Sequence, residues 1–287
     1  MGHMNIYSIS EIKNFFEKGS LAPLRSLGQN FLINGSVSER ITEASGTKGR
    51  NVLEVGPGLG SITEKLLPVS KQVVSVEIDR GMCSFLKSHF SETENFTLIE
   101  GDFLKTDIEV ICQENFGGEK AVLVGNLPYY ITSKCIIKAC EAYSFLDSVT
   151  VMVQKEVGER LVAGAGEGEY GAISAFLSYF SGTEYLFDVS RENFYPVPEV
   201  DSCIIRIDLR PRFDIDLKDY ADAVRGLFLM RRKTVKNNLK NYYRLSASDT
   251  DAVLEKAGID GKRRAETMTA EEFVRVAEAV SKTRDGN

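Results

Sequence analysis

The chain has 287 residues, of which 43% are hydrophobic and 26% are charged, and its formal net charge is −6. This length and composition are enough for a buried core in one large domain or two ordinary ones. No apolar run is long enough to span a bilayer and no secretory signal opens the chain, so we expect no membrane association. Met1–His3, ahead of Met4, look like a cloning remnant and are excluded from fold prediction.

Cysteine and histidine usage limits the chemistry. Five scattered cysteines without a Cys-x-x-Cys pair are typical of a reducing cytoplasm, and they argue against a zinc site or a disulfide framework. Outside the cloning remnant the only histidine is His89, so Ser-His-Asp, Cys-His and multi-histidine metal mechanisms are not expected. The cysteines are Cys83, Cys112, Cys135, Cys140 and Cys203.

The charges are distributed unevenly along the chain. Residues 209–287 hold 17 Lys/Arg and 13 Asp/Glu, whereas residues 1–208 hold 18 and 28. A negative net charge by itself argues against a nucleic-acid partner. The basic C-terminal part weakens that argument, because a local excess of cations is enough to bind phosphates.

The N-terminal part of the chain is predicted to contain two helices joined by an irregular segment. Ser10–Lys18 is predicted to be a helix that Ser10 caps, with Ile12 on its buried face. Leu21–Leu32 has little periodicity, and we expect an ordered segment that packs on the domain over a ligand; a plain connecting loop is the alternative. Asn34–Ala44 is predicted to be a helix.

Short apolar runs alternate with helical patterns through the centre of the chain. Such alternation predicts a parallel sheet that is covered by helices on both faces. The predicted strands are Val52–Val55, Val73–Glu77, Phe96–Glu100, Ala121–Gly125 and Val149–Gln154. The predicted helices between them are Ser61–Leu67, Arg80–Phe90 and Ser133–Tyr143.

The next segment closes the predicted sheet. Helices are expected at Glu156–Val162 and Ala172–Phe180, on either side of the glycine-rich loop Gly164–Gly168. Thr183–Val189 and Ser202–Leu209 are predicted strands, and the alternation in the second indicates an antiparallel edge strand.

Arg210–Arg212 marks a predicted domain boundary, because no strand pattern follows it. The predicted fold is therefore α/β over residues 4–210, with a mostly parallel sheet and one antiparallel edge strand, followed by a small all-α domain over residues 211–287. The C-terminal helices are predicted at Leu217–Phe228, Thr234–Tyr243, Ser248–Ala257 and Ala270–Ser281.

The sequence is organised around a glycine motif, Glu-x-Gly-x-Gly-x-Gly, from Glu54 to Gly60. It follows a predicted strand and precedes a helix, where glycines let the backbone approach a ligand and the helix N-terminus offers free N–H groups. The spacing differs from the Gly-x-Gly-x-x-Gly of a nicotinamide site, although the two overlap. A turn that binds no ligand is the alternative.

Polar residues also end the other predicted strands, at Glu77–Asp79, Glu100–Phe103 and Gly125–Tyr130. Glu77 lies about twenty residues beyond the glycines, where a carboxylate holds ribose hydroxyls in nucleotide-binding folds. Singly, these acids would be turn residues or helix caps. Because the carboxyl ends of parallel strands meet at one edge of a sheet, together they favour a nucleoside-type ligand.

The tetrapeptide Asn126–Tyr129 carries a sharper signal. Pro128 fixes the turn and favours an extended backbone at Leu127. The amide oxygen of Asn126 could then accept a hydrogen bond from an exocyclic amine, and Tyr129 could stack on a base. A rigid strand-to-helix turn with a structural asparagine is the alternative.

These residues carry a family resemblance. Glu54–Gly60 resembles motif I of class I S-adenosylmethionine-dependent methyltransferases, and Asn126–Tyr129 resembles the Asn-Leu-Pro-Tyr motif of N6-adenine methyltransferases. From about residue 21 to about residue 280 the chain is similar to the bacterial ribosomal RNA small-subunit adenine dimethyltransferases, the KsgA/RsmA family. The further segments that carry this similarity are Leu27–Leu32, Phe194–Ser202, Arg231–Thr234, Asn237–Leu239 and Arg264–Glu266.

The resemblance implies a Rossmann-like class I methyltransferase sheet with S-adenosyl-L-methionine as cofactor, S-adenosyl-L-homocysteine as product and no metal. The glycines would admit the methionine moiety of the cofactor, Glu77 would hold its ribose and Asp102 would bind its adenine amino group. The implied cofactor-binding residues are Gln29, Asn30, Leu32, Glu54, Gly56, Gly58, Gly60, Glu77, Ile78, Asp102, Phe103 and Asn126.

The resemblance also implies a reaction. Methyl groups would pass to N6 of two adjacent adenosines in a hairpin loop near the 3′ end of 16S ribosomal RNA, in the biogenesis of the small subunit. Tyr129 and Phe194 would stack on the extruded adenine, and positioning with electrostatics would carry the rate without a general base. The implied catalytic residues are Asn126, Leu127, Pro128, Tyr129 and Phe194.

Arg225–Arg244 contains seven cations and no acid, which favours RNA contact, mostly to phosphates and shape. A solvated helix face is the alternative. We expect a monomer, because no apolar partner helix is evident. The cysteine pattern described above favours the cytoplasm. The predicted RNA-binding residues are Arg225, Arg231, Arg232, Lys233, Lys236 and Lys240.

Three other functions compete with this interpretation. Large-subunit ribosomal RNA methyltransferases of the macrolide-resistance type look similar through residue 200, but Leu127, the acidic net charge and Arg231–Leu239 favour the small-subunit enzyme. A non-catalytic ribosome-assembly factor would not need the intact Asn126–Tyr129 motif. A nicotinamide oxidoreductase is disfavoured by the glycine spacing and by the absence of a catalytic His or Tyr-x-x-x-Lys.

Overall fold

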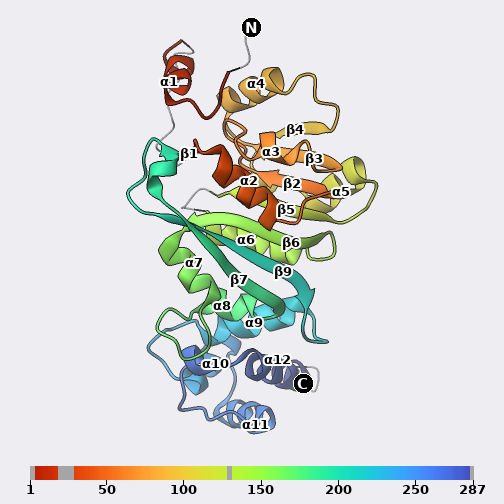
Figure 1. Cartoon of the computed structure of the whole chain (residues 1–287). Coiled ribbons are helices and arrows are strands. Elements are labelled where there is room, and N and C mark those ends of the chain that lie inside the picture. Colours follow the sequence, from red (N-terminus) through yellow and green to blue (C-terminus); the bar gives the residue numbers. More distant parts are fainter. Residues whose placement is uncertain (1–3, 19–28, 128–130, 285–287) are drawn as a thin grey trace. The chain divides into compact units, whose positions relative to one another are not determined.

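A computed structural model describes residues 4–18, 29–127 and 131–284 (Figure 1). Pro128 and Tyr129, two of the predicted catalytic residues, lie outside the described residues, as do Leu27 and Gly28. The chain forms two compact units. Unit 1 comprises Met1–Gly158 and Glu184–Leu209, and unit 2 comprises Glu159–Thr183 and Arg210–Asn287. Unit 2 thus includes residues 159–183, which the predicted boundary at residue 210 assigns to the α/β domain. The division of functions between the two domains stays a prediction.

A seven-stranded sheet in the order β4-β3-β2-β5-β6-β9-β7 confirms the predicted α/β class. β2, β3, β4, β5 and β6 pair in parallel, and β9 pairs antiparallel with β6. The antiparallel strand lies one position in from the edge, between β6 and β7. The strands are β2 (Asn51–Val55), β3 (Gln72–Glu77), β4 (Phe96–Glu100), β5 (Ala121–Asn126), β6 (Leu146–Gln154), β7 (Phe180–Val189) and β9 (Ser202–Pro211).

The strand order reverses direction at the centre of the sheet. The chain runs from β2 outward through β3 to β4, and then returns to place β5 on the other side of β2. Because parallel crossovers are right-handed, this reversal puts the helices before and after it on opposite faces. The carboxyl ends of β2 and β5 then flank the switch point, where open α/β sheets bind their ligands.

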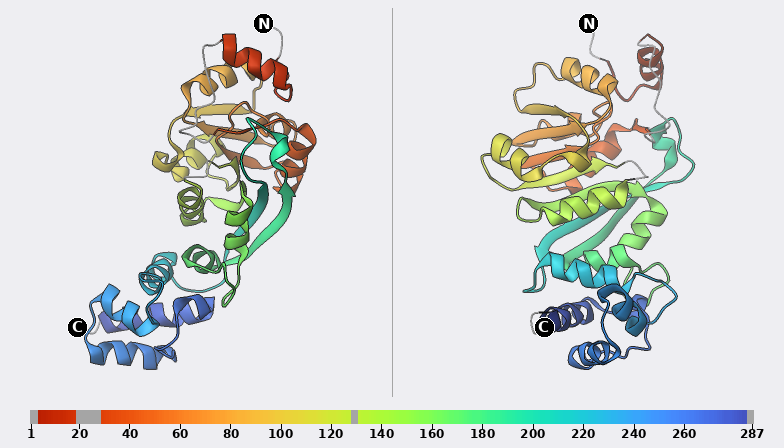
Figure 2. Two further views of the ribbon diagram at one scale, coloured as in Figure 1. Left: turned by 90° about the vertical axis from the view of Figure 1, so that its left-hand side faces the viewer. Right: turned by 180° about the vertical axis from the view of Figure 1, so that it is seen from behind.

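Helices cover the sheet of unit 1 (Figure 2). On one face, Ile41, Leu66 and Leu86 from three helices are buried with Val52 and Val122 of the strands. The helices are α1 (Ile9–Lys18), α2 (Gly35–Ala44), α3 (Thr63–Leu66), α4 (Arg80–His89), α5 (Ile108–Phe116), α6 (Thr132–Glu141) and α7 (Lys155–Val162), and α7 runs on into unit 2.

A small second sheet lies near the ligand-binding edge and was not predicted. β1 (Phe31–Leu32) pairs antiparallel with β8 (Phe194–Tyr195), and Leu32 lies opposite Phe194. The backbone N–H of Ile33 continues this pairing by donating to the carbonyl of Asn193 at 2.8 Å. The sheet joins residues 29–32, the described part of the hexapeptide Leu27–Leu32, to the segment before β9.

Unit 2 is built around a helical core. Tyr220 and Phe273 are fully buried, with ring centroids 6.3 Å apart, and the Tyr220 hydroxyl donates to the carbonyl of Ala175 at 2.7 Å. Its helices are α8 (Ala172–Leu177), α9 (Leu217–Leu227), α10 (Val235–Tyr243), α11 (Ala247–Ala257) and α12 (Ala270–Arg284). Within the part of the chain that the structure describes, no helix is long and apolar enough to cross a membrane.

Candidate active site

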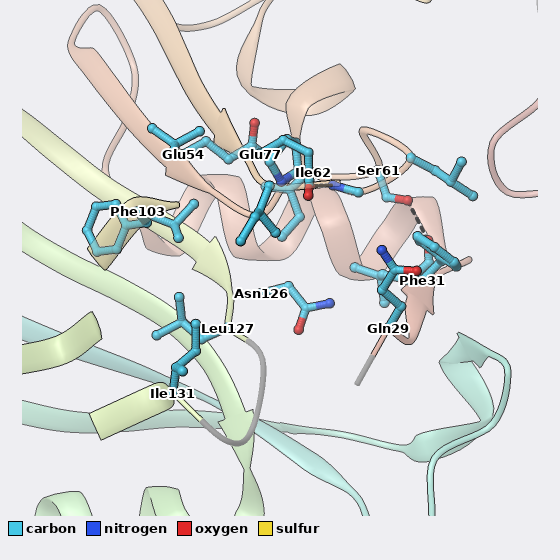
Figure 3. Close-up of a pocket in the computed structure, with 18 of the residues that line it drawn as sticks. Gln29, Phe31, Glu54, Ser61, Ile62, Glu77, Phe103, Asn126, Leu127 and Ile131 are labelled. Atoms are coloured by element: carbon cyan, nitrogen blue, oxygen red, sulfur yellow. Dashed lines mark hydrogen bonds between the residues drawn. The ribbon is translucent and has the colours of Figure 1, made fainter. Parts of the chain in front are cut away.

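A pocket opens at the carboxyl ends of β2, β3, β4 and β5, where the sequence predicted a ligand site (Figure 3). Gly56 follows β2 with φ +68°, and an added Cβ there would lie 3.4 Å from the carbonyl oxygen of Asn126. A Cβ at Gly125 would lie 2.7 Å from the carbonyl of Val55, closer than real contacts allow. The ends of β2 and β5 therefore approach each other as only glycine permits.

The second glycine joins the loop to two neighbours. Gly58 has φ +58°, and its N–H donates to Glu77 Oε2 at 3.1 Å. An added Cβ at Gly58 would lie 3.2 Å from the ring of Phe31, so that ring packs directly on the loop. Glu77 Oε1 accepts a second bond, from the N–H of Asp79 at 2.8 Å. Burial raises the pKa of Glu77, while these backbone donors oppose the shift.

Gly60 differs from the other two glycines of the motif, and its role in cofactor binding stays a prediction. It does not line the pocket. A Cβ added there would lie 3.2 Å from Leu86 of α4 and 2.7 Å from the ring of Phe90, which directly follows α4. With φ +84°, Gly60 is required by the turn and by helix packing.

Residues 29–32 lie along the pocket and are held by three side-chain hydrogen bonds. Asn126 donates from Nδ2 to the carbonyl of Asn30 at 3.2 Å, and Ser61 donates from Oγ to the carbonyl of Leu32 at 2.5 Å. Gln29 donates from Nε2 to Asp79 Oδ2 at 2.8 Å. Figure 3 shows Asn126 between residues 29–32 and Leu127. Because Nδ2 is engaged with Asn30, Oδ1 is oriented as an acceptor on the other side of the amide.

The wall formed after β4 combines a carboxylate and an apolar ring. Asp102 lines the pocket and caps the following turn through Oδ1, which accepts from the N–H of Leu104 at 2.9 Å. Phe103 is buried, with Lys138 Nζ 6.0 Å from its ring centroid. Ile78 also lines the pocket and is 49% exposed, which leaves its side chain available to a flat ligand.

Glu54 is a buried carboxyl at the base of the pocket. Its side chain is 1% exposed, and Oε2 accepts from Thr63 Oγ1 at 2.7 Å and from Ser75 Oγ at 2.6 Å. Burial raises the pKa of Glu54 to about 7, and these hydroxyl donors only partly oppose the shift.

Replacing Glu54 by glutamine is expected to stabilise the ligand-free protein at pH 8 but not at pH 4.5. Folded wild type keeps the Glu54 proton at pH values where the unfolded chain has released it. The contribution of this protonated carboxyl to the free energy of unfolding is therefore fully present below the unfolded pKa and is lost as pH rises through about 7. The difference in free energy of unfolding between Glu54→Gln and wild type should approach about 3 kcal/mol at pH 8. Urea unfolding at both pH values measures it, with exposed Glu94→Gln as control; a difference equal at both pH values would contradict the assignment.

The comparisons with known proteins agree with this geometry. The family model for ribosomal RNA adenine dimethylase matches residues 24–282. The chain belongs to the ribosomal RNA adenine dimethylase family. "Ribosomal RNA small subunit methyltransferase A" of Bacillus mycoides (strain KBAB4) is 38% identical over 284 residues, which cover 96% of this chain and 97% of the relative.

Two solved structures extend the family comparison. A dimethyladenosine transferase from Plasmodium falciparum is 26% identical with a TM-score of 0.72, covering 88% of this chain and 97% of that one. The 23S ribosomal RNA methyltransferase ErmE is 26% identical with a TM-score of 0.64, covering 88% of this chain and 100% of that one. This dimethylase-family chain is therefore an enzyme of the methyltransferase class with the expected fold.

The predicted stacking residue Phe194 does not line the pocket of this dimethylase-family chain. Its ring is 1% exposed and packs in the core with Leu32 and Met152. Stacking on a base is thus unavailable to Phe194 in this conformation, because the β1–β8 pairing directs its side chain inward, and its catalytic role stays a prediction. Leu127 does line the pocket, 2% exposed, and its N–H donates to the carbonyl of Met152 at 3.3 Å.

Ten residues that line the pocket were not among the predicted site residues, namely Phe31, Val55, Pro57, Leu59, Ser61, Ile62, Val76, Gly101, Leu104 and Ile131. Ser61 follows the glycine motif directly, so its position offered a signal, whereas nothing local marks Ile131. Among the described residues, no group of three His, Cys, Asp or Glu side chains is arranged to hold a metal ion.

The predicted RNA-binding cations gather on and around one turn of unit 2, residues 228–234, which we call the basic turn. Arg231, Arg232 and Lys233 are exposed on it, and Arg225 and Lys240 are exposed on the helices either side. These positions are compatible with the predicted contact, which stays a prediction.

Two of the predicted cations are paired with acids within unit 2. Arg225 Nη1 lies 3.9 Å from Asp222 Oδ1 on the same helix, and Lys236 forms the closer pair. Its ammonium pairs with Asp251 of α11 at 2.5 Å, so part of its charge is neutralised within unit 2. The backbone N–H of Lys236 also donates to the carbonyl of Gly261 at 3.1 Å. This bond brings the loop that carries exposed Lys262 and Arg264 beside the start of α10, and neither cation was among the predicted RNA-binding residues.

Proposed function

We propose that this chain transfers methyl groups from S-adenosyl-L-methionine to N6 of two adjacent adenosines in the ribosomal RNA of the small subunit. The observation that carries the proposal is the placement of Asn126. Its amide lies at the switch point of the sheet, beside the glycine loop, with Nδ2 engaged by Asn30. Oδ1 is thereby available to an amine that enters from the side away from the hexapeptide.

The pocket residues fit the proposed cofactor. The Glu77 carboxylate at the end of β3 would accept bonds from ribose hydroxyls, since it is already fixed by Gly58 and Asp79. Ile78 and Phe103 would face the adenine ring, and Asp102 would accept from its amino group. Gly56 and Gly58, both with positive φ and both lining the pocket, leave room for the methionine moiety. Together these residues supply the acceptors and the apolar surface that an adenosine derivative needs.

The proposed reaction requires the chain to align the target amine with the methyl group and to increase the electron density on that amine. S-adenosyl-L-methionine supplies an activated methyl group on a positively charged sulfur. Asn126 Oδ1 and the carbonyl of Leu127 would accept the two N6–H bonds of the target adenine and draw electron density onto N6. Holding the amine in line with the methyl group would supply most of the rate, without a general base. Tyr129 would stack on the extruded base.

The proposed substrate is the small-subunit RNA, in the cytoplasm, with the enzyme acting as a monomer. The relative of 38% identity that spans nearly the same length is named for the small subunit. The ErmE structure, named for 23S ribosomal RNA, is 26% identical. A large-subunit substrate is therefore the second candidate.

Methyl transfer from radiolabelled S-adenosyl-L-methionine to undermethylated small and large subunits, followed by nucleoside digestion, separates these candidates. Dimethyladenosine from the small subunit alone is expected. Label only in the large subunit would favour the second candidate. Firm subunit binding without label would favour a non-catalytic assembly factor.

We further propose that the basic turn contacts RNA phosphates. Neutralising Arg231, Arg232 and Lys233 together to alanine is expected to weaken subunit binding and to flatten the slope of log affinity against log salt by about two units, because each phosphate contact contributes about 0.7–0.9. Filter binding across a salt series measures the slope. The triple variant should keep its cofactor affinity, and an unchanged slope would count against this surface.

A further inference from the structure

The basic turn is held by one buried side chain of the following helix. Asn238 of α10 is 1% exposed. Its Nδ2 donates to the carbonyl of Leu227 at 2.6 Å and to that of Met230 at 3.2 Å. Its Oδ1 accepts from the N–H of Met230 at 3.2 Å. One amide therefore satisfies three backbone groups from the end of α9 to the middle of the turn, where no helix or strand partner exists.

The helices that flank the turn are fixed independently of Asn238. Gly226 of α9 packs against Tyr242 of α10 so closely that an added Cβ would lie 2.6 Å from the ring. The Tyr242 hydroxyl also donates to Asp222 Oδ1 at 2.6 Å. The helix pair thus has its own contacts, and the bonds from Asn238 determine mainly the path of the chain between the helices.

The path of the turn determines where its cations lie. Met230, which Asn238 binds on both its N–H and its carbonyl, directly precedes Arg231 and Arg232. The same Met230 carbonyl accepts from the N–H of Lys233 at 2.9 Å, which closes the turn around the three cations. Removing the Asn238 amide would leave this carbonyl with one protein donor and Leu227 with an unmet acceptor.

We propose that Asn238 is a positioning residue for RNA binding, which acts by holding the basic turn in one conformation before the RNA arrives. This inference rests on the proposed function of that turn. If the turn is already ordered before binding, the conformational entropy of several backbone residues and three long cationic side chains is not lost when RNA binds, so binding is stronger. Asn238 itself is buried and touches no RNA in this proposal.

The test compares Asn238→Ala with Asn241→Ala, which removes an exposed asparagine on the same helix. We expect Asn238→Ala to bind undermethylated small subunits about 10-fold more weakly, as preorganisation is lost. Its affinity for S-adenosyl-L-methionine and its turnover at saturating subunits should match wild type, and so should both properties of Asn241→Ala. Assays are run well below the measured unfolding midpoint of each variant.

A double-mutant cycle with the Arg231, Arg232 and Lys233 triple alanine variant decides whether Asn238 acts through the turn. In the triple background, Asn238→Ala should have no further effect on subunit binding. An equal loss in both backgrounds, or no loss in wild type, would overturn the inference. Unimpaired binding by the triple variant would instead overturn the proposed function of the turn. Asn238→Ser, which keeps one hydrogen-bonding group, carries the same cycle if the alanine variant does not fold.

Discussion

Replacing Asn126 by alanine is expected to lower methyl transfer by about 10²–10³-fold, the cost of removing one preorganised polar group at a reacting centre. Affinity for S-adenosyl-L-methionine should stay within a few fold of wild type. The cofactor would lose only an indirect effect, since the bond from Nδ2 to the carbonyl of Asn30 contributes to holding the hexapeptide. Single-turnover methyl transfer and calorimetric cofactor binding measure the two quantities separately.

Ser61→Ala provides the matched control for Asn126. It removes the other anchor of the same strand, the bond from Ser61 Oγ to the carbonyl of Leu32, and leaves the proposed acceptor in place. If Asn126 acts on the amine, Ser61→Ala should lower methyl transfer far less than Asn126→Ala. Equal losses of transfer in the two variants, or parallel losses of transfer and cofactor affinity in Asn126→Ala, would show that Asn126 only anchors the strand.

Replacing Glu77 by alanine is expected to weaken cofactor binding by about 10²–10⁴-fold, because two hydrogen bonds to a charged group contribute about 1.5–3 kcal/mol each. The same substitution removes the acceptor of the Gly58 N–H and so loosens the glycine loop. Turnover at saturating cofactor should fall much less than affinity. Calorimetric titration with S-adenosyl-L-homocysteine measures the loss without any reaction.

Two further variants sharpen the Glu77 prediction. Glu77→Gln keeps the size of the side chain and one acceptor, so its affinity should lie between those of alanine and wild type. Glu100→Ala removes an exposed carboxylate from the end of the neighbouring strand β4 and should bind the cofactor normally. Unchanged affinity in Glu77→Ala, or an equal loss in Glu100→Ala, would remove Glu77 from the proposed ribose site.

The elements that depend on local pattern were predictable. The strands up to β6 follow from apolar runs, and the carboxyl-end pocket follows from where those runs stop. One local signal was overlooked: α5 has Ile108, Ile111 and Cys112 on its buried face, Asp107 as its cap and Gly117 at its end. This is an ordinary amphipathic pattern with ordinary stop signals.

Features that depend on distant segments were not predictable. The β1–β8 pairing joins residues more than 150 positions apart, so nothing in either segment indicates that Phe194 will turn into the core. The role of Gly60 depends on Phe90, which arrives from α4. Asn238 reads in the sequence as one more polar residue in a basic helix, and only the fold places it beneath the turn.

The chain crosses between its two compact units three times, after Gly158, Thr183 and Leu209. A stop codon near residue 210 would therefore not release a self-sufficient catalytic fragment. Residues 159–183 would remain without the groups they are built around: the Tyr179 hydroxyl would lose the carbonyl of Ile215, and Ala175 would lose the hydroxyl of Tyr220. The apolar side chains of residues 159–183 would be exposed to water, which favours aggregation. A nonsense mutation near codon 210 should thus behave as a null allele.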